Sequence, residues 1–127
     1  MKILITGDFA PQARLAKQIE VKHFSKVFPE EIREIIKSAD FSFVNFESPI
    51  VENGYNPIQK CGPNLRCTKE AAEAVKYAGF TGVTMANNHI LDYGTEGLHK
   101  SVECCKDQGL DVVGVGEDLK DAEEILY

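Results

Sequence analysis

Three short polar clusters each follow an apolar run that is typical of a β-strand. They are Gly7-Asp8, Asn45-Phe46-Glu47 and Asn87-Asn88-His89. Their side chains carry carboxylate, amide and imidazole groups, which can bind divalent metals, and imidazole also carries protons near neutral pH. If the three strands belong to one parallel sheet, their carboxyl ends lie along one edge, where such sheets bind ligands. The sequence therefore predicts a metal-centred site at that edge.

Each cluster also has a purely structural interpretation. Gly-Asp is common in turns, so Asp8 could form an Asx-turn or cap a helix instead. Asn45 and Glu47 point to the same side of their strand and could simply face solvent. The strand before Glu47 looks buried, however, and a carboxylate at the end of a buried strand needs a partner such as a metal ion or an arginine. The third cluster could be a turn in which the histidine merely packs.

Three further side chains could assist this site. Asp92 follows His89 by three residues, close enough for its carboxylate to hold the imidazole in one tautomer. Lys60 and Arg66 lie in an irregular stretch at residues 48–68, and loops of this length are often functional. These two cations could hold an anionic substrate beside a metal, or they could cover a solvated loop surface.

The elements that must position these side chains alternate along the chain. We expect strands at 2–7, 41–46, 81–86 and 111–115, and helices at 12–20, 23–28, from Pro29 onward, 69–78 (ended by Gly79), 95–108 and 119–126. This alternation predicts an α/β fold with a mainly parallel sheet flanked by helices. A length of 127 residues suits a single domain over residues 1–127.

Composition narrows the classes of partner. The formal net charge is −6, which argues against a nucleic-acid backbone as partner but leaves room for a phosphate- or carboxylate-containing small molecule or polymer. No apolar stretch approaches the length of a membrane span, and the amino terminus has no signal-peptide pattern. We therefore expect a cytoplasmic protein.

The three clusters, taken with their neighbours, resemble the sequence blocks of a known family. Gly7-Asp8, then Val-Asn-Phe-Glu-Ser-Pro at 44–49, then Ala-Asn-Asn-His-Ile-Leu-Asp-Tyr-Gly at 86–94 look like three successive motifs of the CapA family. These are the capsule or poly-γ-glutamate biosynthesis proteins, also called PgsA-like. Residues 113–116 followed by Asp121-Ala122 are similar to the next block of the family, so the resemblance covers essentially the whole chain.

The resemblance implies a fold and a set of roles. The family belongs to the calcineurin-like metallophosphoesterase superfamily, whose members have an αββα sandwich and a two-metal site at strand ends. By analogy, Asp8 would bind one metal, Glu47 would bridge the two metals, and Asn88 would bind the second. His89 would protonate the leaving group, and Asp92 would assist it. A two-metal site of this kind catalyses hydrolysis by stabilising both the attacking and the leaving oxygen.

The remaining predictions concern supporting residues, substrate binding and the metal. By analogy Asn45 would be a supporting residue, and we expect the same of Asn87; Lys60 and Arg66 are the candidate substrate-binding residues named above. The metal would be Mn, Zn, Fe or Mg. Where the superfamily has a histidine two residues after the first aspartate, this chain has Ala10.

The family's domain is longer than this chain, so the resemblance implies an amino-terminal half of the sandwich. One face of the sheet would then be uncovered, and a homodimer or a missing carboxy-terminal half would cover it. Two alternatives to a hydrolase stay open. The chain could be a non-catalytic component of an envelope-polymer synthesis or export machinery, or an inactive folded fragment.

Overall fold

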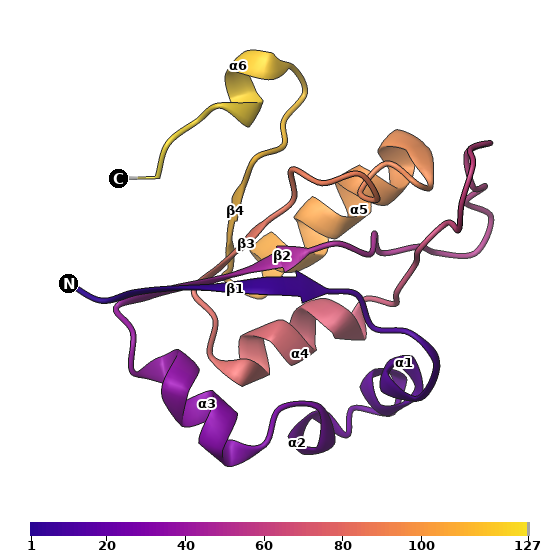
Figure 1. Ribbon diagram of the computed structural model, residues 1–127. Helices are drawn as coiled ribbons and strands as arrows, with labels where there is room; N and C mark the ends of the chain where they lie inside the picture. The colour runs from indigo at the N-terminus through magenta and orange to yellow at the C-terminus, as the bar shows by residue number, and fades with distance from the viewer. Residues whose placement is uncertain (127) are drawn as a thin grey trace.

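The computed structural model describes residues 1–126, which form a four-stranded parallel sheet with helices packed beside it (Figure 1). The strands lie in the order β1-β2-β3-β4 and span Ile3–Phe9 (β1), Phe41–Phe46 (β2), Gly82–Thr84 (β3) and Asp111–Val113 (β4). The helices span Ala13–Glu20 (α1), Phe24–Val27 (α2), Glu30–Lys37 (α3), Glu70–Ala78 (α4), Gly94–Asp107 (α5) and Leu119–Ala122 (α6). The predicted α/β class with a mainly parallel sheet is therefore confirmed.

Most elements lie where the sequence predicts them, and the differences are at their ends. Gly79 ends α4 as predicted, in the left-handed conformation that glycine favours (φ 102°). β3 and β4 end at residues 84 and 113, two residues earlier than predicted. Directly after β3 the chain makes a turn that contains the third polar cluster, and there Asn87 N–H donates to Met85 O at 2.9 Å. α6 is shorter than the predicted helix at 119–126 because none of its residues is buried, and short helices depend on packing.

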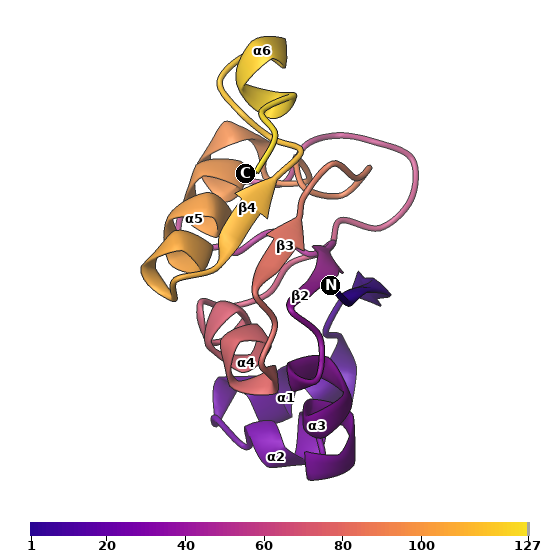
Figure 2. The same cartoon turned by 90° about the vertical axis from the view of Figure 1, so that its left-hand side faces the viewer.

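One face of the sheet is covered by helices. Figures 1 and 2 show α1 to α4 gathered on one side of β1 and β2. The side chains of Val44, Phe46 and Val83 belong to one buried core with Val75 and Ala78 of α4. The side chains that alternate with them on the strands point to the opposite face.

The opposite face of the sheet is open within the described residues. Ile3, Ile5 and Phe41 lie there with exposed fractions of 54%, 77% and 47%. Phe43 lies across Gly82 on this face, since a Cβ atom added to that glycine would come within 2.5 Å of the phenylalanine ring. The uncovered face that the family resemblance implies is therefore present in this part of the chain.

A bulge in β1 changes which side chains face the core. The strand pairs Ile5 with Phe43 but Asp8 with Asn45, so three steps along β1 correspond to two along β2. The extra residue reverses the alternation of side chains. Because of it, Phe9 turns into the helix-covered core and Asp8 turns toward the open side, next to Asn45.

α5 is the longest helix described, with 14 residues. Within residues 1–126, no helix combines the length and the apolar character needed to cross a bilayer.

Candidate functional site

Hydrogen bonds between side chains join the ends of the first three strands. Asn45 at the end of β2 donates from Nδ2 to Oδ1 of Asp8 on β1, at 2.7 Å. Its own Oδ1 accepts from Nδ2 of Asn87, which follows β3, at 3.0 Å. The parallel register places Thr84 next to Asn45, and the Thr84 hydroxyl lies 3.5 Å from the same Oδ1. Three segments far apart in sequence therefore meet at one edge of the sheet.

Asn87 shapes the turn that presents the imidazole. Its Nδ2 also donates to the main-chain oxygen of Phe46, at 3.1 Å. Its Oδ1 accepts from the main-chain N–H groups of His89 and Ile90, at 3.0 and 2.9 Å. An Asx-type bond of this kind is a common way to fix a turn. Asn87 therefore locks the turn onto the end of β2.

His89 lies between two carboxylates. Its Nδ1 is 2.7 Å from Oδ2 of Asp92, and its Nε2 is 3.9 Å from Oε1 of Glu47. The turn continues with a bond from Asp92 N–H to His89 O (2.9 Å), which brings the Asp92 side chain back toward the ring. The side chains of His89 and Glu47 are 15% and 17% exposed, so both reach solvent, whereas the Asp92 side chain is fully buried.

The Asp92 carboxylate is surrounded by donors. It accepts from Lys60 Nζ through Oδ1, and from Leu65 N–H (2.7 Å) and His89 Nδ1 through Oδ2. Burial by itself would raise the pKa of Asp92, but the bonds from Lys60, His89 and Leu65 outweigh it and lower the pKa below its ordinary value. Asp92 is therefore ionised near neutral pH. An acceptor at this place assigns a proton to Nδ1 of His89 and leaves Nε2 facing Glu47.

Lys60 and Arg66, the two predicted substrate-binding cations, lie in different surroundings. The ammonium of Lys60 is engaged with Asp92 and lies 3.2 Å from Nδ1 of His89. Arg66 is exposed, and its guanidinium is 5.9 Å from the centre of the Tyr93 ring. Their substrate-binding role stays a prediction, and Arg66 has the more accessible cation of the two.

Asn88 is the predicted ligand of a second metal, and within the described residues no hydrogen bond joins its side chain to this network. Its side chain is exposed and lines a shallow groove of about 550 Å³ together with Leu98 and Gly116. The structure brings Asp8, Asn45 and Asn87 into one chain of hydrogen bonds. It also brings Glu47, His89 and Asp92 together: His89 bonds Asp92, and its Nε2 lies 3.9 Å from Glu47. Asn88 borders this site from the β4 side, and its metal-binding role stays a prediction.

The donor set fits a divalent cation in kind. The carboxylates of Asp8 and Glu47 and the amide oxygen of Asn88 are hard oxygen donors of the type that Mg²⁺ and Mn²⁺ prefer, and Zn²⁺ accepts them too. In number the set is small: within residues 1–126, no three His, Cys, Asp or Glu side chains gather as a metal cluster would. A cation bound here would therefore take its other ligands from water or from groups outside these residues.

Main-chain N–H groups of the irregular loop also contribute to the site, and no feature of the sequence indicates them. Leu65 N–H bonds the Asp92 carboxylate, and Ile58 N–H donates to the main-chain oxygen of Asp92 at 2.9 Å. Asn64 Nδ2 in turn donates to Ile58 O at 3.0 Å and holds the loop closed on itself. Every residue except proline carries a main-chain N–H, so no residue type marks these donors in advance.

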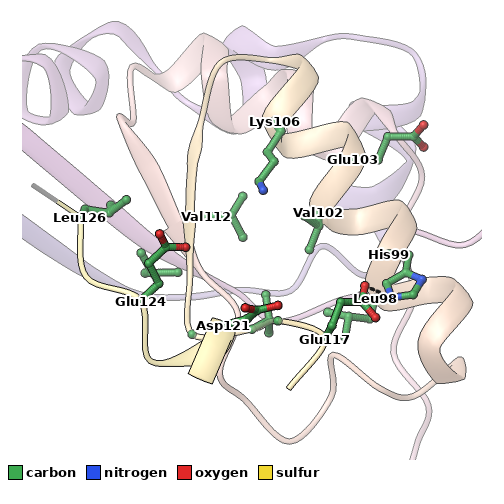
Figure 3. Close-up of a pocket in the computed structure, with 14 residues that line it drawn as sticks. Leu98, His99, Val102, Glu103, Lys106, Val112, Glu117, Asp121, Glu124 and Leu126 are labelled. Atoms are coloured by element: carbon green, nitrogen blue, oxygen red, sulfur yellow. Dashed lines mark ion pairs between the residues drawn. The ribbon is translucent and has the colours of Figure 1, made fainter. Parts of the chain in front are cut away.

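A second cavity lies elsewhere, between α5, β4 and α6. It has a volume of about 530 Å³ and is lined by both charged and apolar side chains, the apolar ones including Val102, Val112 and Leu126. Two lining residues form an ion pair, His99 Nε2 with Glu117 Oε1 at 3.0 Å (Figure 3). None of the residues at the ends of β1 and β2 lines it. We place the functional site at the strand ends because the oriented imidazole is there.

Comparisons with known proteins identify the family to which the chain is similar. The family described as "Bacterial capsule synthesis protein PGA_cap" matches residues 2–127. The chain is 32% identical over 129 residues to "Capsule biosynthesis protein CapA" of Bacillus anthracis; the aligned region covers 100% of this chain and 31% of that protein. It is 31% identical over 119 residues to "PGA biosynthesis protein CapA" of Bacillus subtilis (strain 168); here the aligned region covers 93% of this chain and 31% of that protein. The chain thus spans about a third of the length of these relatives. It belongs to the bacterial capsule synthesis protein PGA_cap family, as its sequence motifs predict.

Proposed function

We propose that this chain carries part of a metal-dependent hydrolase site of the phosphoesterase type, in a protein of capsule or poly-γ-glutamate biosynthesis. The observation that supports it most is the placement of His89 between a buried carboxylate, Asp92, and a partly exposed one, Glu47. A histidine held in this way is a common proton carrier in hydrolases. The chain of hydrogen bonds from Asp8 through Asn45 to Asn87 also supports the proposal, because it aligns oxygen donors along the edge of the sheet where the strands end.

His89 would act as the acid that protonates the leaving group. Its Nδ1 is held by Asp92, so Nε2 is the atom that would deliver the proton. Asp92 would keep the ring in one orientation and one tautomer without touching the substrate. Asn87 would fix the position of the turn relative to β2 through its bond to Phe46 O, and Asn45 would hold the carboxylate of Asp8 in place.

Asp8, Glu47 and Asn88 would hold a divalent cation such as Mn²⁺, Zn²⁺, Fe²⁺ or Mg²⁺. When bound, this cation would supply Lewis-acid stabilisation of negative charge on the substrate. A phosphate- or carboxylate-containing molecule or polymer is the expected substrate class, because its anion would be attracted to the cation and to the exposed guanidinium of Arg66.

Two substitutions test the proposal on the purified chain. Mn²⁺ and Zn²⁺ binding would be measured by calorimetry, and turnover would be measured with p-nitrophenyl phosphate. We expect His89→Ala to retain metal binding and lose about 100-fold or more in kcat. Asn88→Ala should weaken metal binding. His99→Ala and Asn53→Ala, at exposed positions outside the site, are the matched controls. A wild-type chain that binds neither metal and shows no turnover would sink the hydrolase proposal for this chain.

The second candidate is a non-catalytic component of an envelope-polymer synthesis or export machinery. One observation favours it: the contacts of Asp92 with Lys60 and Leu65 also fasten an irregular loop, which is a structural task. Complementation of a deletion strain with the gene carrying His89→Ala separates the two. Restored capsule or poly-γ-glutamate with no turnover favours the non-catalytic component. An inactive fragment would restore nothing in either form.

A further inference from the structure

We infer that Lys60 is a positioning residue of the His89 site, which acts through Asp92 and makes the loop at residues 58–65 part of that site. The inference deepens the proposed hydrolase function and rests on it for its catalytic consequence. Its structural consequence, the coupling between Lys60 and Asp92, can be measured without any activity.

The first step concerns charge. The Asp92 side chain is fully buried, and a buried carboxylate without a compensating cation is strongly destabilising. Lys60 supplies that cation: its Nζ bonds Oδ1 of Asp92, and its own side chain is only 20% exposed. His89 occupies the other carboxylate oxygen, Oδ2. Lys60 therefore compensates the charge of Asp92 at one carboxylate oxygen while His89 bonds the other.

The second step concerns the side of the ring on which Lys60 lies. Its ammonium is 3.2 Å from Nδ1 of His89, whereas the nitrogen that faces Glu47 is Nε2. The two nitrogens lie on different edges of the imidazole. Lys60 is therefore behind the ring, on the side of Asp92, and away from the atom that would meet a leaving group. This placement differs from the substrate contact that the sequence suggested for Lys60.

The third step concerns the loop. Ile58, Lys60 and Leu65 all bond Asp92, the first to its main-chain oxygen and the other two to its carboxylate. Asn64 closes the segment through its bond to Ile58 O. The loop and the imidazole therefore share one carboxylate as their common support. Displacing the loop would remove donors from Asp92 and free the ring to rotate.

A double-mutant cycle tests the inference. Lys60→Met, Asp92→Asn and the double variant would be compared by urea unfolding, with Lys26→Met, an exposed lysine on α2, as the control. We expect Lys60→Met to lower the urea midpoint sharply, because it leaves the Asp92 charge uncompensated. The same change in the Asp92→Asn background should have little further effect, and the double variant should fold even if Lys60→Met does not. Additive effects, or a double variant less stable than both single ones, would overturn the inference.

Kinetics supply the second readout. If Lys60 positions His89, Lys60→Met should lower kcat by about 10- to 100-fold with little change in KM, and Lys60→Arg should restore most of it. If Lys60 bound substrate instead, KM would rise, and the unfolding cycle would show no coupling to Asp92. A chain without turnover would refute the hydrolase proposal and leave the unfolding cycle to decide the role of Lys60.

Discussion

At the scale of single residues, the site depends on side chains that satisfy several partners at once. Asn87 is the clearest case, since its amide makes bonds to Asn45, to Phe46 O and to two N–H groups of its own turn. Its neighbour Asn88 is chemically identical but exposed. Adjacent asparagines thus have different tasks: one builds the site, and the other is available to a ligand.

We therefore expect Asn87→Ala to cost about 2 to 4 kcal/mol of unfolding free energy, because several polar groups lose their partner. Asn88→Ala should cost less than about 0.5 kcal/mol, as is usual at exposed positions. Urea unfolding monitored by circular dichroism measures both. Equal costs at the two positions would contradict the assignment of roles.

The ionisation of Asp92 predicts how the stability of the fold depends on pH. Its pKa is lowered in the folded protein, so its ionised form stabilises the fold above the ordinary carboxyl range, and this contribution is lost as the pH falls through the folded-state pKa. We expect the urea midpoint to fall as the pH drops below about 4, the ordinary pKa of an aspartate, and to continue falling until the lowered folded-state pKa is passed. Asp92→Asn should show a shallower fall, and Asp107→Asn, an exposed control on α5, should keep the wild-type slope. A wild-type slope in Asp92→Asn would argue against the buried ion pair.

At the scale of elements, the bulge in β1 decides which side of the sheet receives Asp8. Regular alternation from Ile3 and Ile5 would place Phe9 on the open face and Asp8 in the core. The bulge reverses this, and the ring of Phe9 lies 5.9 Å from those of both Phe28 and Phe46. An extra residue in one strand thus serves the core and the site together.

The bulge can be tested by stability alone. Phe9→Ala should cost about 3 to 5 kcal/mol, the usual range for a buried phenylalanine. Ile5→Ala, at a side chain that is 77% exposed, should cost less than about 0.5 kcal/mol. Unfolding free energies of the two variants in urea provide the comparison. A larger cost at Ile5 than at Phe9 would mean that β1 continues without the bulge.

At the scale of the whole molecule, helices cover one face of the sheet, and the other face carries exposed apolar side chains. A contiguous apolar surface of this kind is typical of an interface. We propose that this face associates with a second copy of the chain, because pairing would bury the exposed side chains of Ile3, Ile5 and Phe41.

For the isolated chain, we expect concentration-dependent self-association in sedimentation velocity experiments. Changing Ile5 and Phe41 to serine should weaken it, since both are exposed on the open face. Leu119→Ser is the control, because Leu119 is 74% exposed but belongs to α6 and not to a strand of the sheet. A chain that stays monomeric at all concentrations, or that responds equally to the control, would refute self-association through this surface.

The sequence by itself determined the order of strands and helices along the chain, the positions of the three polar clusters and the family. Strand 41–46 was predicted at its observed bounds because its apolar run ends in polar residues, and Gly79 ended its helix as its backbone freedom allows. These signals are local: each is carried by residue types a few positions apart.

Only the tertiary structure decided how the clusters are used. The face of the sheet on which Asp8 lies depends on a bulge, and a bulge forms only between two paired strands. The partner of Lys60 depends on the path of the loop at 58–65, which brings its ammonium to Asp92. The N–H of Leu65 also bonds Asp92, but nearly every residue has such a donor, so its role cannot be identified from the sequence. Contacts between segments distant along the chain are made by packing and backbone geometry, which residue identities a few positions apart do not encode.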